Sequence, residues 1–228
     1  MIINLEFLIN KYNLNINGII HIGAHYGEES NIYSKCSIKD VIWVEANSNL
    51  LEELKKRIGD NRIINECLYN VNKKITFKLM NNSQSSSILD LGLHKVTAPQ
   101  VHVIDKIELE TITAKDMIKK YNIDMNNFNF INIDIQGTEY EVLKSFEEEL
   151  EGIDYIYTEV NKREIYKNCK QIEELDELLS DFERVETEWW DRKNAKKLGC
   201  SYRGPVGWED CAWGDAFYIR KNLNKNNH

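Results

Sequence analysis

The sequence lacks the features that mark several large classes of protein. No run approaches the roughly 18 apolar residues that a membrane-spanning helix needs, and residues 1–6 have neither the basic start nor the apolar core of a signal peptide. The five cysteines form no CxxC pair, so their spacing indicates neither a zinc site nor a disulfide framework. Free thiols are typical of a reducing compartment. We therefore expect a cytoplasmic protein with no membrane partner.

Positive charge is scarce as well. The 228 residues contain 29 Lys and Arg against 37 Asp and Glu, which gives a formal net charge of −8. Such a surface repels phosphate backbones, so nucleic acid is not an expected partner. The hydrophobic fraction of 42% is instead typical of a globular protein, and a chain of this length can bury a full core. Because the sequence shows no internal repeat or linker, we predict a single domain over residues 1–228.

One stretch organises the first half of the chain. Residues 18–22 are apolar and β-branched, as in a buried parallel strand, and Gly23 and Gly27 then form a turn before a predicted helix over residues 28–36. Such a turn lets the backbone approach a ligand at a helix N-terminus. A second apolar run ends in Glu45, and 45 − 23 = 22 positions is close to the roughly 20 expected for an acid that binds ribose hydroxyls. The spacing indicates a nucleoside ligand.

The turn lacks the third glycine of a dinucleotide site. In such sites the middle glycine lets a pyrophosphate touch the backbone, and here His25 stands in its place. S-adenosylmethionine has a ribose but no phosphate, so it fits this turn better than NAD. The alternative that the turn by itself leaves open is an ordinary α/β turn beside a strand that happens to end in Glu.

Apolar periodicity predicts the other elements and the fold class. Predicted helices are residues 5–12 within a lead-in over 1–17, 49–58, 113–121 with a Thr113 cap, a segment from Tyr140 to Phe146, and 172–182. Predicted strands are residues 62–68, 74–80, 101–112 as an edge strand or hairpin, 127–133, 153–158, 184–190 and 216–220. The alternation of strands and helices predicts an α/β fold with a parallel sheet and helices on both faces. The long loop over residues 191–215 is expected to be a substrate-side insertion.

Three carboxylates fall where predicted parallel strands end. They are Glu45, Asp134 and Glu159, and ligands of open α/β sheets bind outside those ends. Asp134 is expected to contact the amino group of a cofactor or to act as a general base, with a helix cap as the structural alternative. His21 is interpreted as a core histidine or a site residue, and His25 as a cofactor contact or a proton-transfer group.

Two further segments have one structural and one functional interpretation. The polar loop over residues 81–87 is either a solvent loop or a source of hydrogen bonds to a cofactor. Trp189, Trp190, Trp208 and Trp213 are either core residues or flat surfaces for a sugar in the cleft. Neither choice follows from the sequence.

These residues resemble the FkbM family of S-adenosylmethionine-dependent methyltransferases. The segment from His21 to Gly27 is similar to the family's DxGAxxG turn, and the segment from Asp134 to Leu143 is similar to its D-x-Q/E-G-x-E-x-x-V/L-L motif. The likeness extends from about Ile19 to Tyr218. It implies a Rossmann-like class I methyltransferase fold, with a seven-stranded, mostly parallel sheet whose last strand is antiparallel. His21 departs from the family, which usually has there an Asp that helps to hold the methionine end of the cofactor.

The resemblance also implies methyl transfer, typically to a hydroxyl. We predict an O-methyltransferase for a small hydroxylated acceptor, first of all a saccharide, with Asp134 and Glu159 as catalytic residues and Trp208 and Trp213 at the substrate. The residues predicted to contact S-adenosylmethionine are His21, Gly23, Ala24, His25, Gly27, Glu45, Ala46, Glu66, Cys67, Ser86, Asp134 and Gln136. The alternatives are an NAD-dependent oxidoreductase and a non-catalytic binding module of the same fold.

The activation of the acceptor hydroxyl has two open versions. Asp134 and Glu159 would hold a magnesium ion, as strand-end acids do in some sugar and catechol O-methyltransferases, or Asp134 alone would act as general base. Two protein acids make a sparse metal site, so the metal-free version is the one that we predict.

Overall fold

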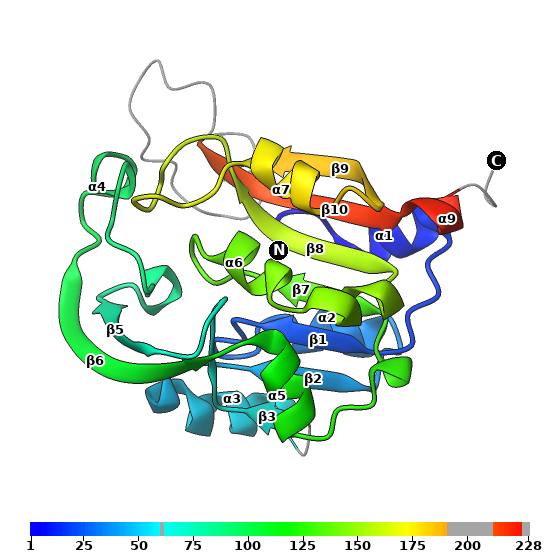
Figure 1. The fold of residues 1–228 in the computed structure, drawn as a ribbon, viewed down its shortest axis with the longest axis horizontal. Helices are drawn as coiled ribbons and strands as arrows, with labels where there is room; N and C mark the ends of the chain where they lie inside the picture. The colour runs from blue at the N-terminus through cyan, green and yellow to red at the C-terminus, as the bar shows by residue number, and fades with distance from the viewer. Residues whose placement is uncertain (60–61, 191–211, 225–228) are drawn as a thin grey trace.

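A seven-stranded sheet forms the centre of the computed structural model, which describes residues 1–59, 62–190 and 212–224 (Figure 1). In spatial order its strands are β3 (Arg62–Ile64), β2 (Val41–Val44), β1 (Ile19–Ile22), β7 (Phe130–Ile133), β8 (Tyr155–Asn161), β10 (Trp213–Arg220) and β9 (Phe182–Trp189). The first five are parallel, while β10 is antiparallel to both of its neighbours. The predicted mostly parallel sheet with an antiparallel last strand is confirmed.

Helices cover both faces of this sheet, as the alternating pattern predicted. The helices α1 (Leu5–Tyr12), α2 (Ser30–Lys35) and α3 (Leu51–Ile58) pack on one face, against a cluster that includes Trp43 and Phe217. On the other face α5 (Ala114–Lys120), α6 (Glu139–Lys144) and α7 (Ile172–Leu178) pack against Ile22 and Ile133. Every residue of β1, β2 and β7 is buried, because a parallel strand with helices on both faces meets no water.

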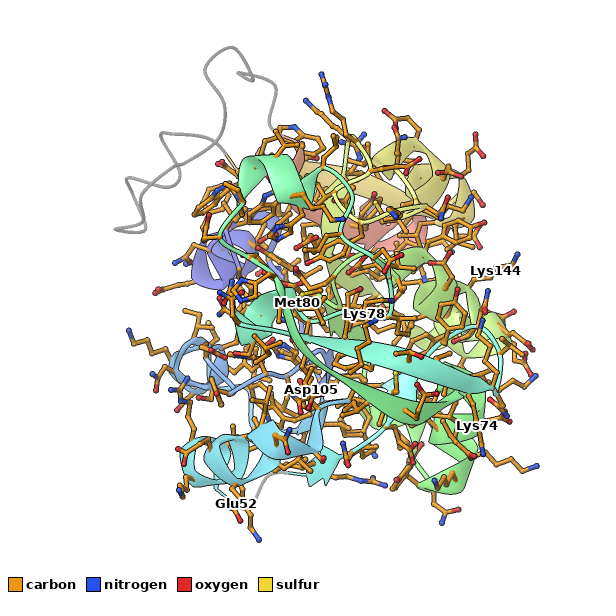
Figure 2. The ribbon with its side chains drawn as sticks, turned by 90° about the vertical axis from the view of Figure 1, so that its left-hand side faces the viewer. Glu52, Lys74, Lys78, Met80, Asp105 and Lys144 are labelled. Atoms are coloured by element: carbon orange, nitrogen blue, oxygen red, sulfur yellow. The ribbon has the colours of Figure 1, made fainter. Side chains whose placement is uncertain are left out.

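A second, three-stranded sheet in the order β4-β6-β5 lies beside the main one, and Figure 2 shows β5 with Lys74 and Met80 near its ends. Its strands are β4 (Cys67–Leu68), β5 (Lys74–Met80) and β6 (Val103–Ile112). The predicted single strand over residues 62–68 was therefore wrong, because Asn65 and Glu66 carry the chain from one sheet to the other. Asn65 Nδ2 donates to the carbonyl oxygen of Glu45 at 2.7 Å, which holds this crossing in place. The strand over residues 101–112 is the middle strand and not an edge.

Several predicted boundaries move. The helix expected over residues 28–36 begins only at Ser30, because the turn after β1 extends through Glu29. Strand β8 runs to Asn161, which pairs with Trp213, so Glu159 lies inside a strand and not at its end. The predicted loop over residues 191–215 was too long at its end, because β10 already begins at Trp213. Residues 191–211 of this loop lie outside the described part of the chain.

The short elements complete the fold. They are η1 (Ser48–Leu50), η2 (Ser83–Ser85), α4 (His94–Thr97), η3 (Met125–Asn127), η4 (Glu147–Gly152) and α9 (Lys221–Asn224). Two local predictions are confirmed in detail: α1 has its expected bounds, and the Thr113 side chain caps α5 by accepting a hydrogen bond from the backbone N–H of Asp116. None of the helices in the described ranges has the length and apolar character needed to span a bilayer.

Candidate active site

A cavity of about 760 Å³ opens at the carboxyl ends of the parallel strands. This volume lies in the range of small-molecule sites. The main sheet supplies its floor, and segments around β5, η2 and α4 supply its walls. Most of the predicted site residues line it, namely His21, Gly23, His25, Glu45, Ala46, Glu66, Cys67, Ser86, Asp134, Gln136, Glu159 and Trp213.

The register of the sheet places the site residues in one transverse row. Ile22 pairs with both Val44 and Ile133, and Ile133 pairs with Thr158. The residue that follows each of these four strand positions therefore lies beside its neighbours. The last of these residues, Glu159, pairs with Asp215 of β10. We call this set the carboxyl-end row: Glu45, Gly23, Asp134, Glu159 and Asp215. Neighbouring strands are about 4.8 Å apart. The row therefore places four carboxylates and one glycine along one side of the cavity.

Gly23 lies between Glu45 and Asp134 in this row, where a side chain would not fit. Its φ is +87°, and a Cβ atom at this position would lie 1.9 Å from the backbone oxygen of Asp134. Only glycine allows the turn to pass so close to β7. Ala24 is fully buried in the core, and Gly27 packs against Leu54 and Ile58, so these two predicted residues shape the turn from behind.

His25 joins the turn to its surroundings. Its backbone N–H donates to Glu45 Oε2 at 2.8 Å, and its ring nitrogens lie 2.8 Å from Glu28 Oε1 and from Ser83 Oγ. Because the ring already has a polar partner at each nitrogen, it fixes the turn to the polar loop. The backbone has φ of +47°, so the tight turn is kept without the glycine that a dinucleotide site would have here.

Glu45 is held rigidly at one end of the row. The side chain is 7% exposed, and its two oxygens accept hydrogen bonds from the backbone N–H groups of His25 and Asn47 at 2.8 and 2.7 Å. Burial raises the pKa of this carboxyl, and those two hydrogen bonds oppose the rise. A carboxylate oxygen has two acceptor sites, so both oxygens can still accept from a ribose diol. Cys67 and Phe77 line the cavity beside it with largely apolar surface.

The polar loop over residues 81–87 faces the cavity, and its hydroxyls are already bonded to protein. Ser86 Oγ accepts from the Met80 N–H at 3.1 Å, and Ser87 Oγ donates to the Gln136 carbonyl oxygen at 2.7 Å. The Ser86 contact fastens the loop to β5, and the Ser87 contact holds it against the motif after β7. The loop is thus an ordered wall of the cavity and not a free solvent loop.

Gln136 fixes the two predicted catalytic acids. Its Nε2 donates to Asp134 Oδ1 at 2.7 Å and to Glu159 Oε2 at 2.9 Å, while its Oε1 accepts from the Tyr166 hydroxyl at 2.6 Å. The reversed amide would point its oxygen at both carboxylates, so these contacts set its orientation. The backbone of Gln136 has φ of +62°, an uncommon value for a residue other than glycine.

Asp134, Glu139 and Glu159 form a tight acidic group. Each offers one oxygen, and these oxygens lie within 4.8 Å of one another. Asp134 is exposed to the cavity but otherwise surrounded by protein, so burial, and after it the charge of Asp215, raises its pKa to about 6. Burial and then Asp134 raise the pKa of Glu139 to about 7, and the same two causes raise that of Glu159 well above its usual range. The group therefore shares protons near neutral pH.

His21 lies two residues before Gly23 in β1, and neighbouring side chains hold its ring in place. Its Nδ1 is 3.0 Å from the Tyr33 hydroxyl, which itself accepts from Asn132 Nδ2 at 2.6 Å. The imidazole stacks on Trp43 with ring centres 4.8 Å apart. Burial lowers the pKa of His21, so the ring is neutral at pH 7. The residue is part of the core and at the same time lines the cavity.

Sequence reasoning missed several lining residues, among them Glu29, Tyr157 and Asp215. Asp215 is 5% exposed and accepts hydrogen bonds from the Tyr157 hydroxyl and from the backbone N–H of Ile2. A carboxylate inside an otherwise apolar strand was the available signal for it. The rings of Trp190 and Trp213 stack, with their centres 5.2 Å apart and an angle of 17° between their planes. Trp208, which was predicted beside Trp213, lies outside the described residues.

The side-chain charge of the cavity is mostly negative. Over residues 1–59, 62–190 and 212–224, no Lys or Arg side chain lines it. Seven carboxylates do, namely Glu28, Glu29, Glu45, Glu66, Asp134, Glu159 and Asp215. A negative potential of this kind repels a pyrophosphate and favours a ligand that carries positive charge.

Comparison with protein families places this cavity in a known context. The sequence profile described as "Methyltransferase FkbM domain" matches residues 21–186, which include the turn after β1 and the motif after β7. No curated protein matches the chain.

Several solved methyltransferase structures are similar to the chain at low sequence identity. An S-adenosylmethionine-dependent methyltransferase from Clostridium acetobutylicum has a TM-score of 0.48 and 8% identity, over 95% of this chain and 89% of that one. Magnesium protoporphyrin IX methyltransferase from Synechocystis, solved with bound S-adenosylmethionine, has a TM-score of 0.47 and 6% identity, over 95% and 76%. A TehB-like methyltransferase from Corynebacterium glutamicum has a TM-score of 0.43 and 10% identity, over 95% and 87%.

Proposed function

We propose, from the premise that the chain belongs to the FkbM methyltransferase domain family, that it methylates a hydroxyl of a small acceptor, first of all a saccharide. Membership makes the chain an S-adenosylmethionine-dependent methyltransferase, which speaks against the nicotinamide alternative. The hydroxyl and the saccharide are the parts that we propose. The observation that carries them is the position of Asp134, which faces the cavity beside Gly23.

The residues of the cavity fit the methyl donor. Glu45 would hold the ribose, the turn at Gly23 would lie under the methionine part, and Cys67 with Glu66 would border the adenine. The negative lining suits a donor whose sulfonium and ammonium groups together outweigh its one carboxylate. When bound, S-adenosylmethionine supplies an electrophilic methyl group. The protein's main contribution is then to align the acceptor oxygen with it, which is worth about 7–11 kcal/mol of the barrier.

Asp134 is proposed to remove the proton of the acceptor hydroxyl. With a pKa raised to about 6 it is mostly ionised at pH 7 yet more basic than an ordinary aspartate. Gln136 Nε2 donates a hydrogen bond to Asp134 Oδ1, so Asp134 Oδ2 is left for the acceptor. Glu159, held by the same amide, would accept a second hydrogen bond from the acceptor.

The stacked pair of Trp190 and Trp213 supports the saccharide. Both side chains are partly exposed and line the cavity next to the acids of the row. Aromatic faces beside carboxylates suit a sugar, because its C–H face packs on a ring while its hydroxyls donate to the acids.

A methyl-transfer assay tests the proposal. The protein would be incubated with S-adenosylmethionine labelled in the methyl group and a panel of neutral mono- and oligosaccharides. We expect label in at least one sugar, in a base-stable linkage as an ether requires, and none with Asp134→Asn. Label on an amine or a carboxylate, or no transfer to any sugar, would contradict the proposed acceptor while leaving the family assignment intact.

A further inference from the structure

Tyr166 is a fully buried residue in the segment between β8 and α7. Its hydroxyl lies 2.6 Å from Gln136 Oε1 and 3.1 Å from the carbonyl oxygen of Ser85. Gln136 and Ser85 both line the cavity, one in the motif after β7 and the other in the polar loop over residues 81–87. Because Tyr166 itself is buried, any effect of its hydroxyl on the reaction has to act through one of these two neighbours.

The hydroxyl of Tyr166 has one proton and two possible acceptors. Burial, and after it the charges of Glu159 and Asp134, raise the pKa of Tyr166 well above its usual range, so the hydroxyl keeps that proton. The shorter contact is the one to Gln136 Oε1. A proton donated to Ser85 would instead leave the hydroxyl oxygen facing Gln136 as an acceptor, which favours the reversed amide. The hydroxyl therefore decides which end of the amide meets the acids.

The orientation of the amide determines how the proposed base is presented. Gln136 Nε2 donates to Asp134 Oδ1 at 2.7 Å and to Glu159 Oε2 at 2.9 Å. An N–H donor stabilises the ionised form of a carboxylate and restricts its rotation. An amide oxygen at the same place would repel both carboxylates. The bond from Tyr166 to Gln136 Oε1 thus favours an ionised Asp134 in a fixed orientation.

The surroundings of Tyr166 hold its ring in place. Its backbone pairs with Leu91 in an isolated antiparallel bridge, and the Gly92 N–H donates to the carbonyl oxygen of Ile165 at 2.9 Å. A Cβ atom at Gly137 would lie 3.0 Å from Tyr166 Cβ, so this glycine lets the turn after β7 pack directly on the tyrosine. The hydroxyl is therefore presented to the amide from a rigid support.

We propose that Tyr166 is a positioning residue for methyl transfer, which fixes the Gln136 amide and through it the orientation of Asp134. The inference rests on the proposed role of Asp134 as general base. Tyr166→Phe keeps the ring and removes the hydroxyl, so the amide can turn and Asp134 loses a fixed donor. Misplacement of a reacting group by about 1 Å can cost about 10²-fold, so we expect kcat to fall about 10- to 10²-fold with little change in KM.

A titration of Asp134 measures this effect without any acceptor. Protein labelled with ¹³C at the aspartate carboxyl carbons would be titrated by NMR around pH 6, the value to which burial and Asp215 raise the pKa of Asp134, and Asp134→Asn would assign the signal. We expect that pKa to be higher in Tyr166→Phe by about half a unit or more, because a carboxylate that loses a donor is protonated more easily. An unchanged pKa would overturn the proposal.

Tyr218→Phe is the matched control for this titration. Tyr218 is also buried, and its hydroxyl donates to Asp176 at 2.8 Å. Its removal should leave the pKa of Asp134 unchanged. An equal shift in both variants would show that the loss of any buried hydroxyl disturbs the site, which would contradict a specific role for Tyr166.

Gln136→Met separates positioning through the amide from a general structural role. This variant should raise the pKa of Asp134 by a similar amount, and adding Tyr166→Phe should have no further effect. Additive shifts would overturn the proposal. The Gln136 variant also tests the bond with Tyr166 intact: the buried hydroxyl proton should give a slowly exchanging NMR signal that moves when the amide is removed. A signal that stays in place would mean that the proton goes to Ser85, and would equally overturn the proposal.

The kinetic readout uses the sugar that accepts label from the wild-type protein. Tyr166→Phe should lower kcat and leave both KM and the Kd for S-adenosylhomocysteine close to wild type, with thermal melting to confirm that the variant is folded. A change confined to KM would contradict positioning of the base. If the wild-type protein labels no sugar, the proposed function fails, and the titration of Asp134 still decides the role of Tyr166.

Discussion

Asp215 and Glu159 lie directly opposite each other on the antiparallel strands β10 and β8, and both side chains are buried. Like charges at such a position destabilise a sheet. The protein compensates with neutral donors, the Tyr157 hydroxyl for Asp215 and Gln136 Nε2 for Glu159. Burial raises the pKa of both carboxyls, so each takes up a proton more readily than an exposed acid would. Such a costly pair lies where the acceptor is proposed to bind.

Glu45→Ala should weaken the binding of the donor. The change removes the acceptor of the proposed ribose hydrogen bonds, worth about 1.5–3 kcal/mol for bonds to a charged group. Calorimetry with S-adenosylhomocysteine and with 5′-methylthioadenosine should show similar losses, because both ligands contain the ribose. Unchanged affinity for the two would show that Glu45 only anchors the turn through His25 and Asn47.

Asp134→Asn should lower turnover by about 10²–10⁴-fold, the usual contribution of a general base. Its affinity for S-adenosylhomocysteine should change little. The wild-type rate should rise with pH through about 6, because the base must be ionised and its pKa is raised to about that value by burial and by Asp215. A variant that stays fully active, or a wild-type rate that is flat between pH 5 and 7, would remove Asp134 from the mechanism.

Stability should fall as pH rises toward neutrality. Burial, with the charge of Asp134, raises the pKa of Glu139 from 4.5 to about 7, so between these values the folded state holds a proton that the unfolded chain has released. The free energy of unfolding then decreases with pH, by at most about 3 kcal/mol from this group. Glu139→Gln should flatten the dependence in urea titrations, since its amide oxygen can still accept from Ile135 and Gly137. The same slope in wild type and variant would contradict the assignment.

Gly23→Ala should be far more harmful than Gly59→Ala. Both glycines have positive φ, +87° and +69°, so each substitution carries backbone strain of about 1–2 kcal/mol. Only at Gly23 would the new Cβ also meet backbone, the Asp134 oxygen at 1.9 Å, whereas nothing lies within 4 Å at Gly59. Thermal melting should show a modest shift for Gly59→Ala and a much larger one for Gly23→Ala. Equal shifts would mean that the turn can move away from β7.

Activity should survive dialysis against a chelator. Asp134, Glu139 and Glu159 have a spacing that a divalent cation could bridge, but Gln136 Nε2 already donates to two of them and Glu139 accepts from the Ile135 and Gly137 N–H groups. These bonds leave the three carboxylates with fewer free lone pairs for a metal ion. Loss of turnover that magnesium restores would replace the metal-free base with a metal-assisted one.

Local chemistry explains what the sequence alone determined. Buried parallel strands are continuous apolar runs, glycines mark a tight turn, and helices repeat every 3.6 residues, so the sheet, its two helical layers and the turn at Gly23 could be predicted. Glu45 and Asp134 followed from the same signals, because each comes directly after an apolar run. The strand over residues 62–68 was misread because a two-residue crossing at Asn65 and Glu66 has no periodic signal.

Only the tertiary structure decided which distant residues share the cavity. Asp215 stands 215 − 134 = 81 positions after Asp134, and it enters the carboxyl-end row solely because β10 pairs with β8 in one register. A shift of one residue would turn its side chain to the other face. Glu29 and Trp190 likewise reach the cavity through the placement of α2 and β9. Strand register and helix placement are set by packing over the whole core, and no short stretch of sequence contains that information.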